Sequence, residues 1–290
     1  MRPAPRAVRR WHPSPAIAAS LLLHGSALLA FLAWPRHWPA LLAVLIANHA
    51  VLTAYGMIPR SGALGPNITR LPRAWAARGA VALTFDDGPD PAVTPAVLDL
   101  LDRHGAKATF FCIGERVESA PDLARTIRRR GHDIANHTHR HPYGFAAFGP
   151  WRTRREIERA GHAIRAATGR PATLFRAPMG LRSPLLDPVL SWTGYRLVSW
   201  SGRGLDGVDG RADKVLRRLG RNLRPGAILL LHDGNSAWTS DGKPVVLEVL
   251  PRLLAIMAER RLRSVTLGEA LRRDGGDDES SPPADARSCR

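Results

Sequence analysis

The stretch Thr84-Phe85-Asp86-Asp87-Gly88-Pro89 places two adjacent carboxylates between an apolar run and a Gly-Pro turn. The apolar residues just before it, Val81-Ala82-Leu83, predict a buried strand that ends at the two acids. Successive side chains of a strand point in opposite directions, so Asp86 and Asp87 can take separate roles, one binding a metal and one moving a proton. Asp, Gly and Pro also form ordinary turns, so the pair needs a second signal before it indicates a site.

The second signal is a histidine cluster about fifty residues later, Gly131-His132-Asp133-Ile134-Ala135-Asn136-His137-Thr138-His139-Arg140-His141-Pro142. His137 and His141 are four residues apart, and within one helical turn that spacing brings both imidazoles to one side. Zinc prefers neutral imidazole, and a catalytic zinc takes three protein ligands and leaves a position for water. Two histidines and one carboxylate fit such a site. The alternative for this segment alone is a solvated histidine-rich loop.

Four ordered strings carry a resemblance to a known family: TFDDGPDP, HTHRHP, FRAPMG and ILLLHDG. In this order they resemble the motifs of carbohydrate esterase family 4, the NodB-homology polysaccharide deacetylases, over roughly residues 80–270. The resemblance implies hydrolysis of the N-acetyl group of a glycan. It further implies an α/β fold, a distorted (β/α) barrel of about seven parallel strands.

The resemblance also implies a role for each site residue. Asp87, His137 and His141 would bind a divalent metal, with zinc expected and cobalt or nickel as alternatives. A bound metal lowers the pKa of its water toward about 7, which supplies a nucleophile at neutral pH. The roles implied for the other residues are general base for Asp86, general acid for His232, an ion pair with Asp86 for Arg176, and oxyanion binding by the backbone N–H for Met179.

Two strings depart from the family pattern. The third motif usually reads Arg-Pro-Pro-Tyr, whereas this chain has Arg176-Ala177-Pro178-Met179 and lacks the Tyr ring. The fourth usually reads Asp-x-x-Asp-Trp, whereas this chain has Arg203-Gly204-Leu205-Asp206-Gly207. Asp206 stays a candidate acid that tethers Arg176 or His232. The missing aromatic rings predict a different or more open sugar site.

Apolar runs and amphipathic stretches alternate from residue 80 onward, a pattern that favours a parallel sheet. Strands are expected near 80–85, 107–113, 132–136, 173–176, 195–200, 226–231 and 263–266. Helices are expected at 95–103, 120–130, 152–168 and 245–260. Each motif then falls at the carboxyl end of a strand, the end at which barrel enzymes assemble their active sites.

The first sixty residues have a different composition. Two apolar stretches, 15–34 and 39–58, are each long enough to span a bilayer. A cleaved signal peptide is the alternative, but the first run is long for one and no small-x-small site precedes Pro35. The predicted organisation is a membrane anchor over 1–60, a linker over 61–79, the deacetylase domain over 80–272 and a disordered tail over 273–290.

The side of the membrane on which the catalytic domain lies stays open. Arginines before the first span favour a cytoplasmic N-terminus, and two complete spans would return the domain to the cytoplasm. A cell-wall deacetylase would have to face outward instead. Either arrangement makes the bacterial inner membrane the expected location.

The composition adds little to the functional prediction. The net charge of +17 comes from scattered arginines without an aromatic-interleaved stripe, so no nucleic-acid partner is expected. Cys112 is expected to be a buried apolar residue, and a disulfide with Cys289 is not expected.

Three functions follow from these residues. The first is a metal-dependent deacetylase of peptidoglycan or a chitin-like glycan. The second is a deformylase or deacetylase of a lipid-linked sugar at the cytoplasmic membrane face. The third is a catalytically silent carbohydrate-binding relative, against which the retention of the five core candidates argues: Asp86, Asp87, His137, His141 and His232.

Overall fold

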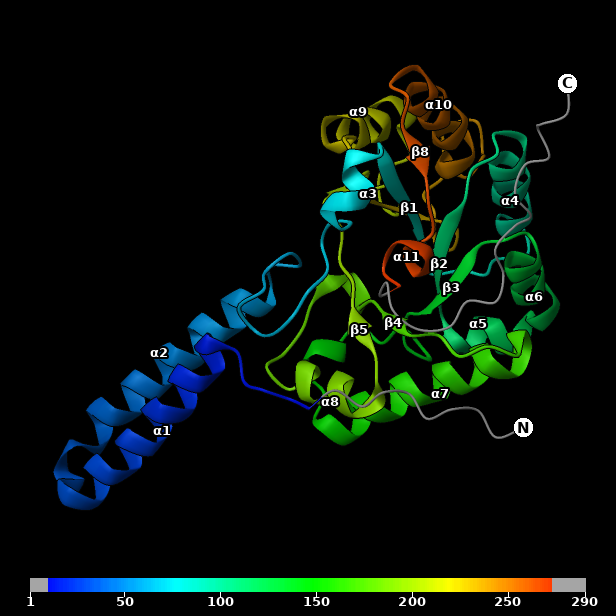
Figure 1. Ribbon diagram of the computed structural model, residues 1–290. Coiled ribbons are helices and arrows are strands. Elements are labelled where there is room, and N and C mark those ends of the chain that lie inside the picture. Colours follow the sequence, from blue (N-terminus) through cyan, green and yellow to red (C-terminus); the bar gives the residue numbers. More distant parts are fainter. Residues whose placement is uncertain (1–9, 273–290) are drawn as a thin grey trace, which may run out of the picture.

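A computed structural model describes residues 10–272 as a curled sheet domain with a helical hairpin projecting from it (Figure 1). The strands are β1 (Ala80–Asp86), β2 (Ala108–Cys112), β3 (Asp133–Asn136), β4 (Leu174–Phe175), β5 (Arg196–Leu197), β6 (Gly202–Arg203), β7 (Ile228–His232) and β8 (Arg263–Ser264). The predicted tail and Cys289 lie outside the described residues.

All the strand pairings are parallel, and the order is β5-β4-β3-β2-β1-β7-β6, with β8 pairing with the first residues of β1. The predicted fold, an incomplete (β/α) barrel, is confirmed, and each of the seven expected apolar runs contains a strand. β6 was not predicted, because Gly202–Arg203 contains no apolar side chain.

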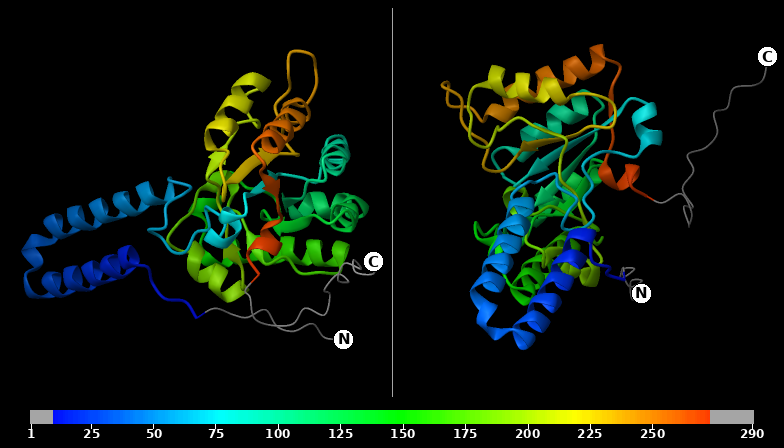
Figure 2. Two further views of the ribbon diagram at one scale, coloured as in Figure 1. Left: turned by 45° about the horizontal axis from the view of Figure 1, so that its top comes forward. Right: turned by 90° about the vertical axis from the view of Figure 1, so that its left-hand side faces the viewer.

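Helices cover the outer face of the sheet, as Figure 2 shows from two further directions. They are α4 (Thr94–Arg103), α5 (Gly114–Ser119), α6 (Pro121–Arg129), α7 (Pro150–Thr168), α8 (Leu186–Thr193), α9 (Ala212–Asn222) and α10 (Val245–Glu259). Two short helices, α3 (Arg73–Ala77) and α11 (Leu267–Ala270), pack instead against the smaller core inside the curl. The longest of the outer helices, α7, begins with Pro150, whose fixed φ suits a first helical turn. It ends at Gly169, whose φ of 72° is the left-handed conformation that stops a helix.

The side chains of β1 alternate between two cores, as the period of a strand requires. One set packs beneath the helices in the larger core: Val81, Leu83 and Phe85. The other set lines the smaller core inside the curl of the sheet, beginning with Ala80 and Ala82. Thr84 and Asp86 continue this second set as buried polar residues. The strand therefore delivers Asp86 to the interior of the curl.

The strand register brings the carboxyl ends of five strands together. Asp86 at the end of β1 pairs with His232 at the end of β7. On the other side of β1, Asn136 at the end of β3 pairs with both Cys112 and Phe175. Residues that directly follow these strand ends therefore emerge at one edge of the sheet, which is where the predicted site residues lie.

Two apolar helices, α1 (Pro15–Ala33) and α2 (Trp38–Gly56), form the hairpin, joined by the short 3₁₀ helix η1 (Pro35–His37). Both are long and apolar enough to cross a membrane, with mean hydropathies of 2.0 and 1.5, and most of their residues are exposed. Polar contacts join the two helices, including a 2.8 Å hydrogen bond from Asn48 Nδ2 to Ser20 Oγ. Length and composition alone do not separate a membrane anchor from a signal sequence.

The base of the hairpin is attached to the sheet domain by hydrogen bonds. Ser14 Oγ donates to the carbonyl of Ala63 at 2.6 Å. The carbonyl of Gly56, the last residue of α2, accepts from the amide of Arg182 at 3.2 Å. Three residues further on, the Pro59 carbonyl accepts from Ser199 Oγ at 2.7 Å. Both ends of the hairpin thus meet the domain on the same side.

Candidate metal centre and active site

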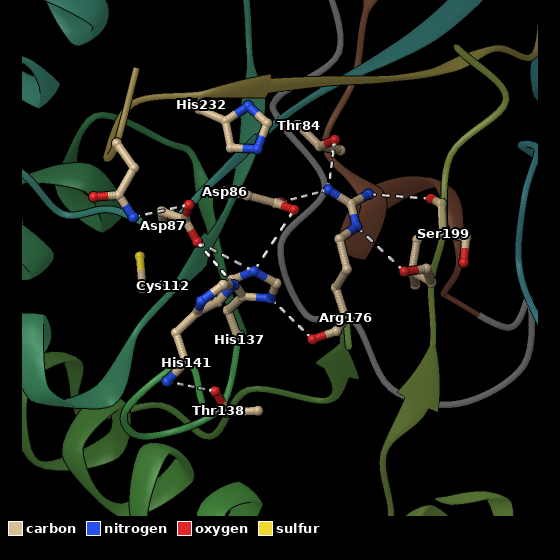
Figure 3. A network of polar contacts seen from close by, with 12 residues as sticks. Thr84, Asp86, Asp87, Cys112, His137, Thr138, His141, Arg176, Ser199 and His232 are labelled. Atoms are coloured by element: carbon tan, nitrogen blue, oxygen red, sulfur yellow. Dashed lines mark hydrogen bonds and ion pairs between the residues drawn. The ribbon is translucent and has the colours of Figure 1, made fainter. Parts of the chain in front are cut away.

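Asp87, His137 and His141 converge at the carboxyl edge of the sheet (Figure 3). Asp87 Oδ1 lies 3.3 Å from His137 Nε2 and 3.4 Å from His141 Nε2. One ligand atom from each of the three residues lies within 4.8 Å of the others. A carboxylate oxygen and two imidazole nitrogens at this spacing match the ligand set of a divalent metal such as zinc.

The contacts around the three residues leave their ligand atoms available. His137 Nδ1 donates to the carbonyl of Arg176 at 2.9 Å, which turns the lone pair of Nε2 toward Asp87. Asp87 Oδ1 is buried without a hydrogen-bond partner among the described residues, whereas Oδ2 accepts from Asn235 Nδ2 at 3.1 Å. A buried carboxylate oxygen needs a partner, and a cation would supply one. The residues present therefore fit a metal.

Burial raises the pKa of Asp87, but the nearby imidazole of His137, followed by those of His141 and His232, outweighs it and lowers that pKa well below its usual range. The carboxyl group is therefore ionised at neutral pH, as a ligand must be.

The two histidines converge by a route that differs from the expected one. The expectation of a helical turn is wrong, because residues 137–141 form an irregular loop directly after β3. Thr138 and His141 have φ values of 67° and 51°, in the left-handed region that non-glycine residues rarely adopt. These two residues reverse the chain, and a hydrogen bond from the amide of His141 to Thr138 Oγ1 at 3.0 Å closes the loop.

Arg176, the residue after β4, forms a fully buried ion pair with Asp86. Its Nη1 lies 2.6 Å from Asp86 Oδ1 and also donates to Thr84 Oγ1. Nη2 and Nε donate to the carbonyls of Ser199 and Val198, so every guanidinium nitrogen is used. Asp86 Oδ2 lies 3.8 Å from His137 Nε2, on the side of the ligand cluster. The pair fixes the Asp86 carboxylate next to the proposed metal position.

His232, at the end of β7, is oriented by Asp206. The fully buried Asp206 carboxylate accepts from the backbone amide of His232 at 2.7 Å and lies 3.1 Å from its Nδ1. Burial lowers the pKa of His232, but the Asp206 charge and hydrogen bond, followed by the charges of Asp86 and Asp87, raise it to about 9. Of the two partners considered for Asp206, the structure places it on His232 and not on Arg176.

Met179 lies in the loop after β4, within the 3₁₀ turn η3 (Pro178–Gly180). Its φ of 55° turns the backbone out of the helical conformation at this residue. Within residues 10–272 its amide has no hydrogen-bond acceptor. The N–H is therefore available to a ligand, as an oxyanion donor requires.

Two residues of the site escaped the sequence analysis. Asn235, three residues after His232, donates to Asp87 and accepts from Arg116 Nη2 at 2.8 Å. Arg116 Nη1 also donates to the carbonyl of Asp87 at 2.9 Å. Proximity to the ILLLHDG string could have indicated Asn235. Arg116 lies at the start of α5, within no motif, so nothing in the pattern indicated it.

Strained backbone is concentrated around the site. Seven described non-glycine residues have positive φ, and six of them belong to the loops that carry or flank the site: Asp87, Thr138, His141, Met179, Leu205 and Asn235. Each such conformation costs about 1–3 kcal/mol and persists only where the surrounding structure enforces it. The framework therefore holds these loops in conformations that position side chains rather than in relaxed ones.

The curled parallel sheet and the Asp-His-His cluster at its carboxyl edge agree with the resemblance to the NodB-homology deacetylases. The sequence profile of the polysaccharide deacetylase family matches residues 76–198. A chitooligosaccharide deacetylase from Sinorhizobium fredii is 40% identical over 169 residues, which cover 57% of this chain and 76% of the relative. The chain therefore belongs to the polysaccharide deacetylases of carbohydrate esterase family 4, a family of hydrolases.

Other relatives extend the likeness. A peptidoglycan-N-acetylglucosamine deacetylase from Bacillus cereus is 33% identical over 66% of this chain and 88% of its own length. Among solved structures, a family 4 pseudoenzyme from Bacillus anthracis superposes with a TM-score of 0.63 at 24% identity, covering 71% of this chain and 69% of the other. At 24% identity, the similarity to this pseudoenzyme bears on the fold alone.

Proposed function

We propose that the protein is a metal-dependent deacetylase that removes N-acetyl groups from an oligosaccharide or polysaccharide of N-acetylglucosamine type, either chitin-like or peptidoglycan. The names of the two relatives described above, a chitooligosaccharide deacetylase and a peptidoglycan-N-acetylglucosamine deacetylase, refer to these two classes of glycan. A divalent metal, with zinc expected, would be held by Asp87, His137 and His141. When bound, such an ion lowers the pKa of its water toward about 7 and polarises the acetyl carbonyl.

The other residues of the site supply the proton transfers. Asp86, paired with Arg176, accepts the proton of the attacking water. The free N–H of Met179 stabilises the oxyanion of the acetyl group. His232 is protonated at neutral pH because of Asp206, and it donates a proton to the amine as the C–N bond breaks.

The observation that carries this proposal is that Asp86 and His232 are each paired with a residue of opposite charge. The two residues are register neighbours on β1 and β7, yet each has its own counter-ion. Arg176 pairs with Asp86, and Asp206 pairs with His232. A base paired with a guanidinium beside an acid paired with a carboxylate is an arrangement that suits amide hydrolysis at neutral pH. A silent binding protein would have no need of it.

We further propose that α1 and α2 anchor the enzyme in the bacterial inner membrane. Because both ends of the hairpin meet the domain on one side, a spanning hairpin places residue 14 and the catalytic domain on the same face. With arginines at the N-terminus, that face would be cytoplasmic. A cytoplasmic catalytic domain favours the second candidate function. The substrate would then be the N-acyl group of a lipid-linked sugar and not that of a cell-wall polymer.

The test is acyl release by the full-length protein in neutral detergent, loaded with zinc. The substrates are N-acetylglucosamine oligomers, peptidoglycan and a lipid-linked N-acetylglucosamine, with acetate and formate measured separately. Acetate from the first two supports the glycan deacetylase. Release from the lipid-linked sugar alone supports the second candidate, and no release from any substrate by folded, metal-loaded protein contradicts both.

Two variants separate metal binding from proton transfer. Asp86→Asn should keep one zinc per chain and lose turnover, since Asp86 is not a ligand. Asp87→Asn should lose both, because a three-ligand site loses one bond. Zinc content by mass spectrometry is the readout that does not depend on activity. An Asp86→Asn protein that emptied of zinc would overturn the assignment of ligand and base.

A further inference from the structure

A concave site that does not include His232 is lined in part by β6 and the loop after it. It is a hollow of about 390 Å³ between the residues that follow α2 and the carboxyl-terminal half of α9. That volume falls within the range of small-molecule sites, about 300–1,000 Å³. Its charged lining consists of four arginines: Arg60, Arg203, Arg218 and Arg221. Among residues 10–272, no acidic side chain lines it.

Three of the four arginines carry charge that no carboxylate neutralises within the described part of the chain. Arg218 is paired with Asp209 at 2.9 Å. Arg60 donates to the carbonyl of Ser201 at 3.2 Å, Arg203 lies over the ring of Trp200, and neither forms an ion pair. Arg221 also forms no ion pair. Its position in the last turn of α9 is favourable because a cation there offsets the helix dipole. The helix dipole accounts for the presence of Arg221 but not for that of the other arginines around the hollow.

We propose that this hollow binds the phosphate group of a membrane lipid. Guanidinium groups bind phosphate oxygens through paired, charge-assisted hydrogen bonds, and several arginines around one concave site are typical of phosphate recognition. The lining also includes Ile58 and Trp200, apolar surface that suits the portion of the ligand next to its phosphate. The phosphate belongs either to an anionic phospholipid headgroup or to a lipid-linked saccharide.

The position of the hollow relative to the hairpin supports a lipid ligand. Ile58, Pro59 and Arg60 line it and directly follow the end of α2 at Gly56. Arg218 and Arg221 of α9 line the same hollow as these residues, so they lie near the base of the hairpin. A hairpin in a bilayer therefore brings these arginines toward the headgroup region, where the anionic lipids of the cytoplasmic leaflet lie.

The hollow also shares a wall with the active site. Leu205 lines it, and the next residue, Asp206, holds His232. A phosphate bound there would thus lie one loop away from the proposed acid. The proposal itself concerns binding and stands or falls independently of acetyl release.

The test measures the affinity of the full-length, zinc-loaded protein in neutral detergent for two soluble probes, by calorimetry at fixed ionic strength. The probes are glycerol 3-phosphate, which represents a phospholipid headgroup, and N-acetylglucosamine 1-phosphate, which represents a lipid-linked saccharide. Uncharged N-acetylglucosamine measures any binding through the acetyl group at the catalytic site. The pocket variant is Arg203→Gln/Arg221→Gln.

The matched control is Arg155→Gln/Arg159→Gln, which removes two arginines from an arginine-rich surface of α7. We expect the pocket variant to bind at least one phosphate probe tenfold or more weakly, and the control to bind both within twofold of the original protein. Tighter binding of glycerol 3-phosphate assigns the site to phospholipid, and tighter binding of the sugar phosphate assigns it to a saccharide carrier. Equal losses in both variants, or no phosphate binding to the original protein, would overturn the proposal.

Discussion

The substitution Asp206→Asn tests whether Asp206 keeps His232 protonated. Asp206 is the main group that raises the pKa of His232, from an ordinary value of 6.5 to about 9, against the opposing effect of burial. By the relation between pKa and free energy this rise corresponds to about 3 kcal/mol. Loss of the charge should return the pKa to 6.5 or below, because burial is then unopposed.

The expected loss of activity depends on pH in a specific way. A general acid works only in its protonated form, so kcat/KM falls as the pH rises through its pKa. At pH 8 a group with a pKa of 9 is about 90% protonated, and one with a pKa of 6.5 is about 3% protonated. Asp206→Asn should therefore lower acetate release by about 30-fold at pH 8 and by less than about twofold at pH 6. A bound cation lowers the pKa in both proteins, so the comparison is between the two alkaline limbs.

Asp209→Asn is the matched control, because it removes the same charge from the same loop. Asp209 pairs with Arg211 and Arg218 and has no contact with His232. The assay is acetate release from N-acetylglucosamine oligomers between pH 5.5 and 10, with thermal melting to verify folding. If the alkaline limbs of Asp206→Asn and the original protein coincide, either Asp206 does not control His232 or His232 is not the acid.

Further measurements test the framework around the site. Arg176→Ala should destabilise the protein by about 3–5 kcal/mol, because it leaves the buried Asp86 charge unpaired, and thermal or denaturant unfolding would detect this; a change below 1 kcal/mol would contradict the ion pair. Met179→Gly should retain activity within about threefold, since glycine accepts a φ of 55° and keeps the N–H; a hundredfold loss of kcat would instead assign the reaction a need for the side chain. The His232–Asp206 pair should contribute fully to the free energy of unfolding below about pH 6.5, and this contribution should be lost as the pH rises through about 9, because the pKa of His232 is higher in the folded than in the unfolded protein. The difference in unfolding free energy between the original protein and Asp206→Asn, measured without metal, should therefore become smaller between these two pH values.

The sequence predicted the fold well because its strands are buried on both faces and appear as continuous apolar runs. The sequence also predicted that the two acids stand at the end of β1, but not that both carboxylates face His137, whose Nε2 lies 3.8 Å from Asp86 Oδ2 and 3.3 Å from Asp87 Oδ1. The route by which His137 and His141 meet was not predictable, since it depends on left-handed residues that have no compositional signal in Thr138 or His141. β6 was missed for a similar reason, as its two residues are not apolar.

The limits of the site were less predictable than its centre. The residues that carry chemistry belong to contiguous strings, whereas the residues that orient them come from distant parts of the chain. Arg116 reaches Asp87 across 29 residues of sequence, and Ser199 reaches Arg176 across 23. Such partners are determined by strand register and loop path, which become visible only in three dimensions. Asp206 is intermediate, because its position was identified but the choice between its two partners was not.

The hydrogen bonds at the base of the hairpin affect how the enzyme meets its substrate. The carbonyl of Ser199 accepts a hydrogen bond from Arg176, and the Ser199 hydroxyl donates one to the carbonyl of Pro59. Pro59 lies three residues after the end of α2, so the hairpin is linked closely to the active-site framework. An enzyme on a flexible tether sweeps a volume and reacts with any substrate inside it. With the hairpin in a membrane, as proposed above, this attachment would instead give the catalytic face one height and one tilt relative to the bilayer. Substrate choice would then depend on how far a glycan stands from the surface as well as on its chemistry.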